Sequence, residues 1–81
     1  MTLDLTPTRR VGLPVDARGE LPDAATLAGR LQAAVDRAAG AGLDVELHVS
    51  PGADLPGPQA AVLAAARESA GPRGVDVRVV A

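Results

Sequence analysis

Few residues in this sequence could do chemistry, and they are scattered along the chain. His48 is the single histidine, and it shares a run of alternating residues with the carboxylates of Asp44 and Glu46. Such a group could act in acid–base catalysis or bind a metal ion. The chain has no cysteine and no second histidine, which excludes an HExxH site and a cysteine-ligated zinc. We therefore expect no catalytic or metal-binding residues, and an exposed His48 that pairs with Glu46 or with an arginine of a neighbouring strand.

A loop rich in glycine and proline, residues 51–58, precedes a predicted helix and could cradle an anion with its N–H groups. It lacks the lysine and the hydroxyl residue of a P-loop. Its segment Gly52-Ala53-Asp54-Leu55 resembles the GADL segment of crotonase-fold enzymes, in which backbone N–H groups stabilise a thioester enolate. A crotonase needs roughly three times this length. The chain therefore leaves open only a degenerate crotonase-like partner subunit, and we expect a stiff connector suited to binding a partner.

Composition excludes further functions. Eighty-one residues predict a single domain, 1–81, with a thin core that has no aromatic side chain. The net charge of −2 argues against duplex binding, and the lack of aromatic residues removes the platform that stacks single-stranded bases. No apolar run is long enough for a membrane span, and residues 1–20 do not resemble a signal peptide. We expect a cytoplasmic protein without a cofactor, without nucleic acid and without membrane insertion, and no enzymatic activity.

The elements that must position these residues follow from periodicity. Residues 2–6 and 9–15 alternate like two strands of a loose hairpin, and Pro14 indicates an edge or a strand end. Residues 23–39 have the apolar spacing of a helix, with Asp23 as its N-cap. Arg30 and Arg37 fall outside that apolar stripe, and we expect two glycines to end the helix in a left-handed cap: Gly40 and Gly42.

The second half of the chain repeats the pattern. Residues 43–49 alternate most clearly, with one polar face, so helices should cover only one side of the sheet. Residues 59–70 are helical, with Pro58 in the first turn, and residues 75–80 form the last strand. The apolar residues expected to face inward in these three elements are Leu43, Val45, Leu47, Val49, Val62, Leu63, Ala66, Ala70, Val75, Val77 and Val79.

The order is then β-β-α-β-α-β. It predicts an α/β fold with a small mixed four-stranded sheet, at least three of its strands parallel, and two helices on one face. Glu46 and Arg78 would pair if their strands adjoin.

The stretch from Gly19-Glu20-Leu21 to Asp23-Ala24-Ala25-Thr26 resembles the "GELDAAT" opening of the first helix in STAS domains, the anti-anti-sigma-factor-like domains of bacteria, with Pro22 as an extra residue. Val45–Ser50 looks like their "vvDLS" strand, with His48 in place of the usual Asp, and the spacing onward through Ala60–Arg67 and Arg73–Val80 fits the family pattern without a gap. The resemblance covers about residues 10–80. The resemblance implies a STAS-like fold and a protein partner such as an anti-sigma kinase or a transporter ATPase. It also implies an open part of the sheet, since the usual C-terminal helix has no counterpart before Ala81.

The resemblance has one informative departure. Switching members of the family carry a phosphorylated Ser at the start of the second helix, and Gly57 stands at that position here. No hydroxyl side chain lies between Ser50 and Ser69. The resemblance therefore implies a binder that phosphorylation at this position does not switch.

We expect the chain to be a non-enzymatic protein-binding module. A small accessory or structural subunit of a larger assembly, or of a homo-oligomer, is the main alternative. The residues expected to bind the partner lie in the loop and at the start of the second helix: Asp54, Leu55, Pro56, Gly57, Pro58, Gln59, Ala61 and Val62.

Overall fold

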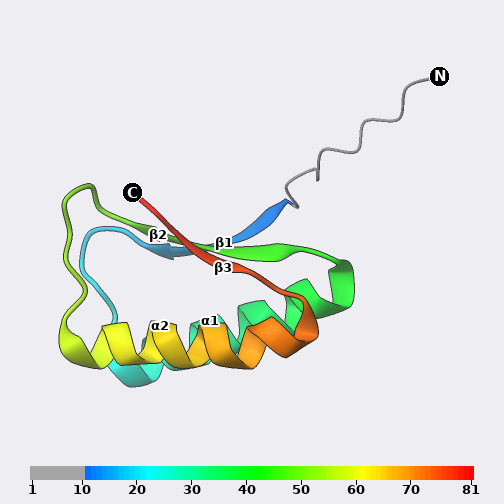
Figure 1. The fold of residues 1–81 in the computed structure, drawn as a ribbon. Helices are drawn as coiled ribbons and strands as arrows, with labels where there is room; N and C mark the ends of the chain where they lie inside the picture. The colour runs from blue at the N-terminus through cyan, green and yellow to red at the C-terminus, as the bar shows by residue number, and fades with distance from the viewer. Residues whose placement is uncertain (1–10) are drawn as a thin grey trace.

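A computed structural model of the chain describes residues 11–81. Three strands and two helices alternate along it, and a short 3₁₀ helix follows the second helix (Figure 1). The elements are β1 (Gly12–Ala17), α1 (Ala24–Ala41), β2 (Asp44–Val49), α2 (Gly57–Ala70), the 3₁₀ helix (Gly71–Arg73) and β3 (Val77–Val80).

The sheet of the described residues has three parallel strands in the order β1-β2-β3. Figure 1 shows both helices on one face of this sheet, as the one-sided polar pattern of β2 predicts. The α/β class and the three parallel strands are confirmed. The predicted strand 2–6 and the first two residues of the predicted strand 9–15 lie outside the described residues. The strand expected at 9–15 instead runs from Gly12 to Ala17, two residues further than predicted.

Both ends of α1 follow from local chemistry. Asp23 is the N-cap, and its Oδ1 accepts a hydrogen bond of 2.8 Å from the Thr26 N–H. Gly42 is the C-cap, with a φ of 71°, a left-handed conformation that glycine adopts without strain. The helix continues two residues beyond the predicted end, because Gly40 remains helical and only Gly42 ends it.

Helix α2 begins two residues earlier than predicted, at Gly57, and Pro58 lies in its first turn as expected. In the first turn the missing N–H of proline costs no helical hydrogen bond. The helix ends at Ala70, where Gly71 and Pro72 start the 3₁₀ helix.

The core lies between the sheet and the two helices, and only small aliphatic residues build it. Its largest fully buried side chains are Leu27, Leu31, Val35, Val45 and Leu47. Val75 and Val77 are buried as predicted, and Leu43, Val62 and Ala66 are half-buried at its margin.

Val79 lies opposite the buried Leu47 in the register, on the helix side of the sheet as predicted, but it is 40% exposed. Figure 1 shows β3, at the edge of the sheet, rising away from α2 towards the C-terminus. The helix therefore covers the end of the strand less fully than it covers Val77 (Figure 1).

Within residues 11–81, no helix combines the length and the apolar character that crossing a membrane requires.

Candidate functional site

The predicted partner-binding residues lie at one end of the domain, in the loop after β2 and the first turns of α2. The loop starts with a turn in which the Ala53 N–H donates to the Ser50 carbonyl at 3.0 Å. Gly52 has a φ of 76°, so the turn needs a residue without a side chain there. Pro56 is the N-cap of α2, and its carbonyl accepts the first helical hydrogen bond, from the Ala60 N–H at 2.9 Å.

The eight residues divide into an exposed and an anchored group. Asp54, Pro56, Gly57, Pro58 and Ala61 are exposed. The other three are half-buried: Leu55 and Val62 pack against the core, and the Gln59 Nε2 donates to the Pro22 carbonyl at 3.2 Å. The last contact ties the start of α2 to the segment before α1, which makes Gln59 an anchor of this surface.

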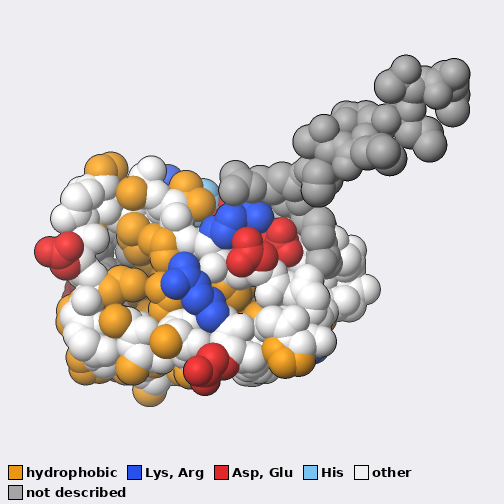
Figure 2. Space-filling model, viewed as in Figure 1, with side chains coloured by type: hydrophobic (Ala, Val, Ile, Leu, Met, Phe, Trp, Pro, Cys, Tyr) orange, Lys and Arg blue, Asp and Glu red, His pale blue; other side chains and the backbone are white. Residues whose placement is uncertain are grey.

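The outward face of α2 continues this surface without a charge. Ala60, Ala61, Ala64 and Ala65 are exposed, and the first charged residue of the helix is Arg67. Figure 2 shows apolar side chains spread over the part of the visible face where the loop and the first turns of α2 lie. We call this region the α2 surface; its members are Leu55, Pro56, Pro58, Ala60, Ala61, Val62, Ala64 and Ala65.

The other face of the sheet carries the polar residues of β2 and β3. Arg78 Nη1 lies 3.0 Å from Asp44 Oδ2, and Arg78 Nη2 lies 3.3 Å from Glu46 Oε2. Partial burial by itself would lower the pKa of Arg78, but hydrogen bonds to Glu46 and Asp44 raise it. The expected pairing of Glu46 with Arg78 is confirmed.

His48 lies beside this network and is half-buried, where an exposed side chain was expected. Its Nε2 is 3.4 Å from Glu46 Oε1, but no described residue forms a hydrogen bond with it. Within residues 11–81 no three metal-ligating side chains come together. Arg78 pairs with the carboxylates of Asp44, Glu46 and Asp76, so this network joins β2 to β3.

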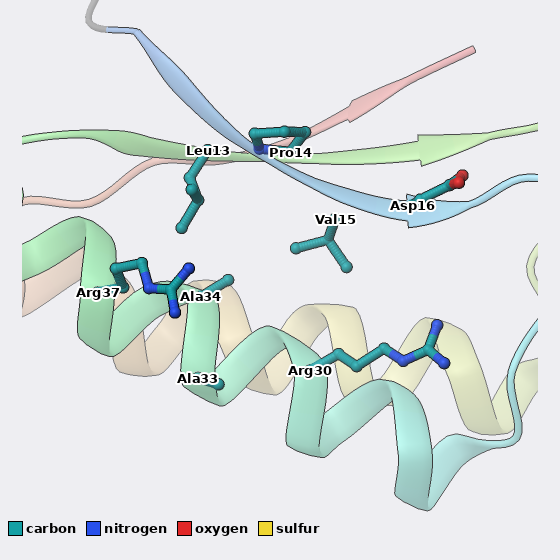
Figure 3. Close-up of a pocket in the computed structure, with 8 residues that line it drawn as sticks. All are labelled: Leu13, Pro14, Val15, Asp16, Arg30, Ala33, Ala34 and Arg37. Carbon is teal, nitrogen blue, oxygen red and sulfur yellow. The ribbon is translucent and has the colours of Figure 1, made fainter.

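A groove that the sequence did not reveal runs between β1 and α1, with a volume of about 380 Å³. Figure 3 shows Leu13 and Val15 pointing from β1 towards the helix, with Ala33 and Ala34 on the helix below them. Arg30 and Arg37 lie on the helix to either side of the two alanines. The complete lining is Leu13, Pro14, Val15, Asp16, Arg30, Ala33, Ala34 and Arg37, which we call the β1–α1 groove.

The outer edge of β1 borders this groove. The Asp44 N–H donates to the Val11 carbonyl at 3.0 Å. In a parallel ladder the backbone N–H and C=O groups of successive residues point alternately to the two sides of the strand. The backbone groups of the odd-numbered residues of β1 therefore point towards β2, while their side chains point towards α1. The backbone groups of Gly12, Pro14 and Asp16 point to the other edge of β1, which no strand within residues 11–81 covers, and Pro14 has no N–H to offer an additional strand there.

The arginines of the described residues differ in their partners. Arg18, Arg73 and Arg78 pair with carboxylates, and the Arg67 Nε donates to the Val77 carbonyl at 3.1 Å. Within residues 11–81, Arg30 and Arg37 alone have no polar partner. Their position outside the apolar stripe was visible in the sequence, but their place beside β1 was not.

No protein-family model matches this chain, and neither does any curated protein or solved structure.

Proposed function

We propose that this chain is a non-enzymatic protein-binding module that docks a partner on the α2 surface. The observation that carries this proposal is the lack of any charged side chain on the exposed part of α2 before Arg67. Exposed helix faces in water are normally charged or polar. An uncharged face of alanine, next to Leu55 and two prolines, fits the apolar centre of a protein interface.

The form of the surface also favours a protein over a small molecule. Pro56 and Pro58 restrict the backbone, and Gln59 fixes it to Pro22, so little conformational entropy is lost on binding. Alanine side chains let a partner approach the helix backbone closely. Asp54, at the margin, is the one titratable group among the predicted binding residues, which leaves no set of groups for catalysis.

A more specific proposal, about the partner and its regulation, rests on the resemblance to anti-anti-sigma-factor-like domains. Gly57 is the first residue of α2, at the helix end where a phosphate group would be stabilised by free N–H groups. Glycine cannot be phosphorylated, so we propose a binder that is not switched there. Its partner would be an anti-sigma kinase or the ATPase subunit of a transporter.

The test is a quantitative pull-down from the cells that express the protein, with partners identified by mass spectrometry. Ala61→Arg adds a charge to the centre of the α2 surface and preserves helix propensity. Ala41→Arg is the matched control, because Ala41 is exposed at the C-terminal end of α1 and is not part of the α2 surface. Circular dichroism establishes that both variants fold.

We expect one partner to be recovered with the unmodified chain and with Ala41→Arg, and to be lost with Ala61→Arg. Equal recovery with all three proteins would remove the α2 surface as the binding site. Recovery of other copies of this chain alone, or of a metabolic enzyme in fixed ratio, would favour the accessory-subunit alternative.

A further inference from the structure

We propose that the β1–α1 groove binds an amphipathic helix of a partner protein, and that this helix carries two acidic residues seven positions apart. The groove is distinct from the α2 surface, because the two share no residue. The proposal therefore adds a second binding site to the molecule.

The charges of the groove specify acidic residues in the partner. Arg30 and Arg37 are exposed, and they have no polar partner within residues 11–81, whereas every other described arginine has one. Asp16 also lines the groove, but its Oδ1 is 3.1 Å from the Arg18 Nε and accepts the Arg18 N–H. The two free cations therefore determine the charge that the groove attracts.

The spacing of the two arginines specifies a helix. They are seven residues apart on α1, which corresponds to about 10.5 Å along a helix axis. In a partner helix packed alongside α1, residues i and i+7 lie on one face at the same spacing. Residues on one face of a strand repeat at roughly 6.7 Å or 13 Å, so a strand matches the two cations less well.

The floor of the groove suits the apolar face of such a helix. Leu13 is half-buried and Val15 is 8% exposed, and both point towards α1 (Figure 3). Ala33 and Ala34 lie between the two arginines and let a second helix approach to the usual interaxial distance of about 8–10 Å. The groove thus has an apolar centre with a cation on each side.

The outer edge of β1, which no other strand of the described residues covers, argues against the main competing occupant, an added strand. Pro14 faces that edge and lacks the N–H that a pairing strand would need. A helix satisfies its own backbone and needs nothing from the edge.

The experiment titrates the full chain into a labelled peptide of about 20 residues, long enough to form a helix in isolation. The peptide has an alanine- and leucine-rich face with glutamates at positions i and i+7. A second peptide of the same composition has its glutamates five residues apart, which places them about 140° apart around the helix. Fluorescence anisotropy gives the dissociation constants at low and at high salt.

We expect the first peptide to bind the unmodified chain at least five-fold more tightly than the second. Arg30→Gln and Arg37→Gln should each weaken its binding about three-fold, and together about ten-fold, with smaller effects at high salt. Ala25→Glu changes the net charge by the same single unit at an exposed position outside the groove, and should leave binding unchanged. Ala33→Gln, which places a longer polar side chain on the floor, should also weaken binding.

Several results would overturn the proposal. Equal binding of the two peptides would show that the spacing is irrelevant, and no binding would show that the groove is closed to a helix. An acidic peptide with prolines that prevent a helix, if bound as tightly, would identify a strand as the occupant. A single-stranded oligonucleotide that competes at the same site would identify a nucleic acid. Dimerisation of the chain that is lost in Arg30→Gln/Arg37→Gln would identify a second copy.

Discussion

Arg78 lies directly opposite Glu46 in the register of β3 and β2, and its Nη2 is 3.3 Å from Glu46 Oε2. The same guanidinium reaches Asp44, whose Oδ2 is 3.0 Å from Nη1. Asp44 is only 6% exposed, and its Oδ1 also accepts the Asp76 N–H at 3.0 Å. The polar face of the sheet is therefore held together by its own charges, and Asp44 joins the start of β2 to the segment that leads into β3.

This arrangement predicts a large effect of Asp44→Ala. The substitution removes the acceptor of the Asp76 N–H and one partner of the partly buried Arg78, which should cost about 2–3 kcal/mol of unfolding free energy. Urea unfolding followed by circular dichroism measures it, because the chain has no aromatic residue for fluorescence. Asp36→Ala breaks an exposed pair with Arg73 and should have a much smaller effect. Equal effects of the two substitutions would show that Asp44 contributes no more than a surface pair.

Gly12 provides a second prediction, because the side chain of Glu46 lies across it. A Cβ built on Gly12 would overlap Glu46 Cγ and Cδ. Gly12→Ala should therefore displace Glu46 from Arg78 and lower the unfolding free energy by about 1–2 kcal/mol, although alanine is otherwise preferred to glycine in a strand. The same unfolding measurement tests this.

The control is the same substitution in a Glu46→Ala background, where the overlap is gone. There Gly12→Ala should be neutral or stabilising by roughly 0.5 kcal/mol. A double-mutant cycle gives the coupling between the two sites directly. If Gly12→Ala destabilised both backgrounds equally, the close approach of Glu46 would not explain its effect.

The sequence predicts the parts of this fold that depend on local chemistry. Asp23 and Gly42 bound α1 because a capping carboxylate and a left-handed glycine act within a few residues. The alternation in β2 predicts a sheet with one covered face, and the crossovers predict parallel strands. Local patterns do not determine how closely an element packs on its neighbour, so the alternation places Val79 on the inward face without predicting that it is 40% exposed.

The two candidate binding surfaces also differ in how far the sequence predicts them. The α2 surface is contiguous in sequence, so its residues could be named in advance, although the anchoring role of Gln59 depends on the distant Pro22. The β1–α1 groove joins a strand and a helix that are separated by a loop. Its two arginines stand out in the helical pattern, but only the three-dimensional structure shows that they lie on either side of Ala33 and Ala34.

The contrast between two valines of β3 gives a third prediction. Val77 is 2% exposed and Val79 is 40% exposed, although both were expected to face inward. Val77→Ala should lower the unfolding free energy by about 2 kcal/mol, because it leaves a cavity beneath α2. Val79→Ala is the matched control and should cost less than about 0.5 kcal/mol. Similar losses in both variants would mean that the end of β3 is covered in solution.

Three carboxyl groups should make the stability of the folded chain sensitive to acid. Hydrogen bonds from Thr26 lower the pKa of Asp23 below its usual value, and the bond from the Thr26 backbone N–H has the larger effect. Arg18 lowers the pKa of Asp16, and Arg73 and then Gln32 lower that of Asp36, in each case chiefly through a side-chain hydrogen bond. A carboxyl with a lower pKa in the folded chain binds fewer protons there than when unfolded. Its contribution to stability is present above the unfolded value of about 3.9 and is lost as pH falls through the folded value.

The melting temperature should therefore decrease once the pH is lower than about 4. The substitution Asp23→Asn isolates one of the three carboxyl contributions. Asparagine also caps helices and can accept the hydrogen bond from the Thr26 N–H, but it does not titrate in this range. Melting curves from neutral pH to about pH 2 compare the two proteins. At neutral pH the charged Asp23 also interacts favourably with the N-terminal end of α1, so the unmodified chain should melt higher. This advantage should shrink as Asp23 becomes protonated, and two parallel curves would show that Asp23 makes no acid-sensitive contribution.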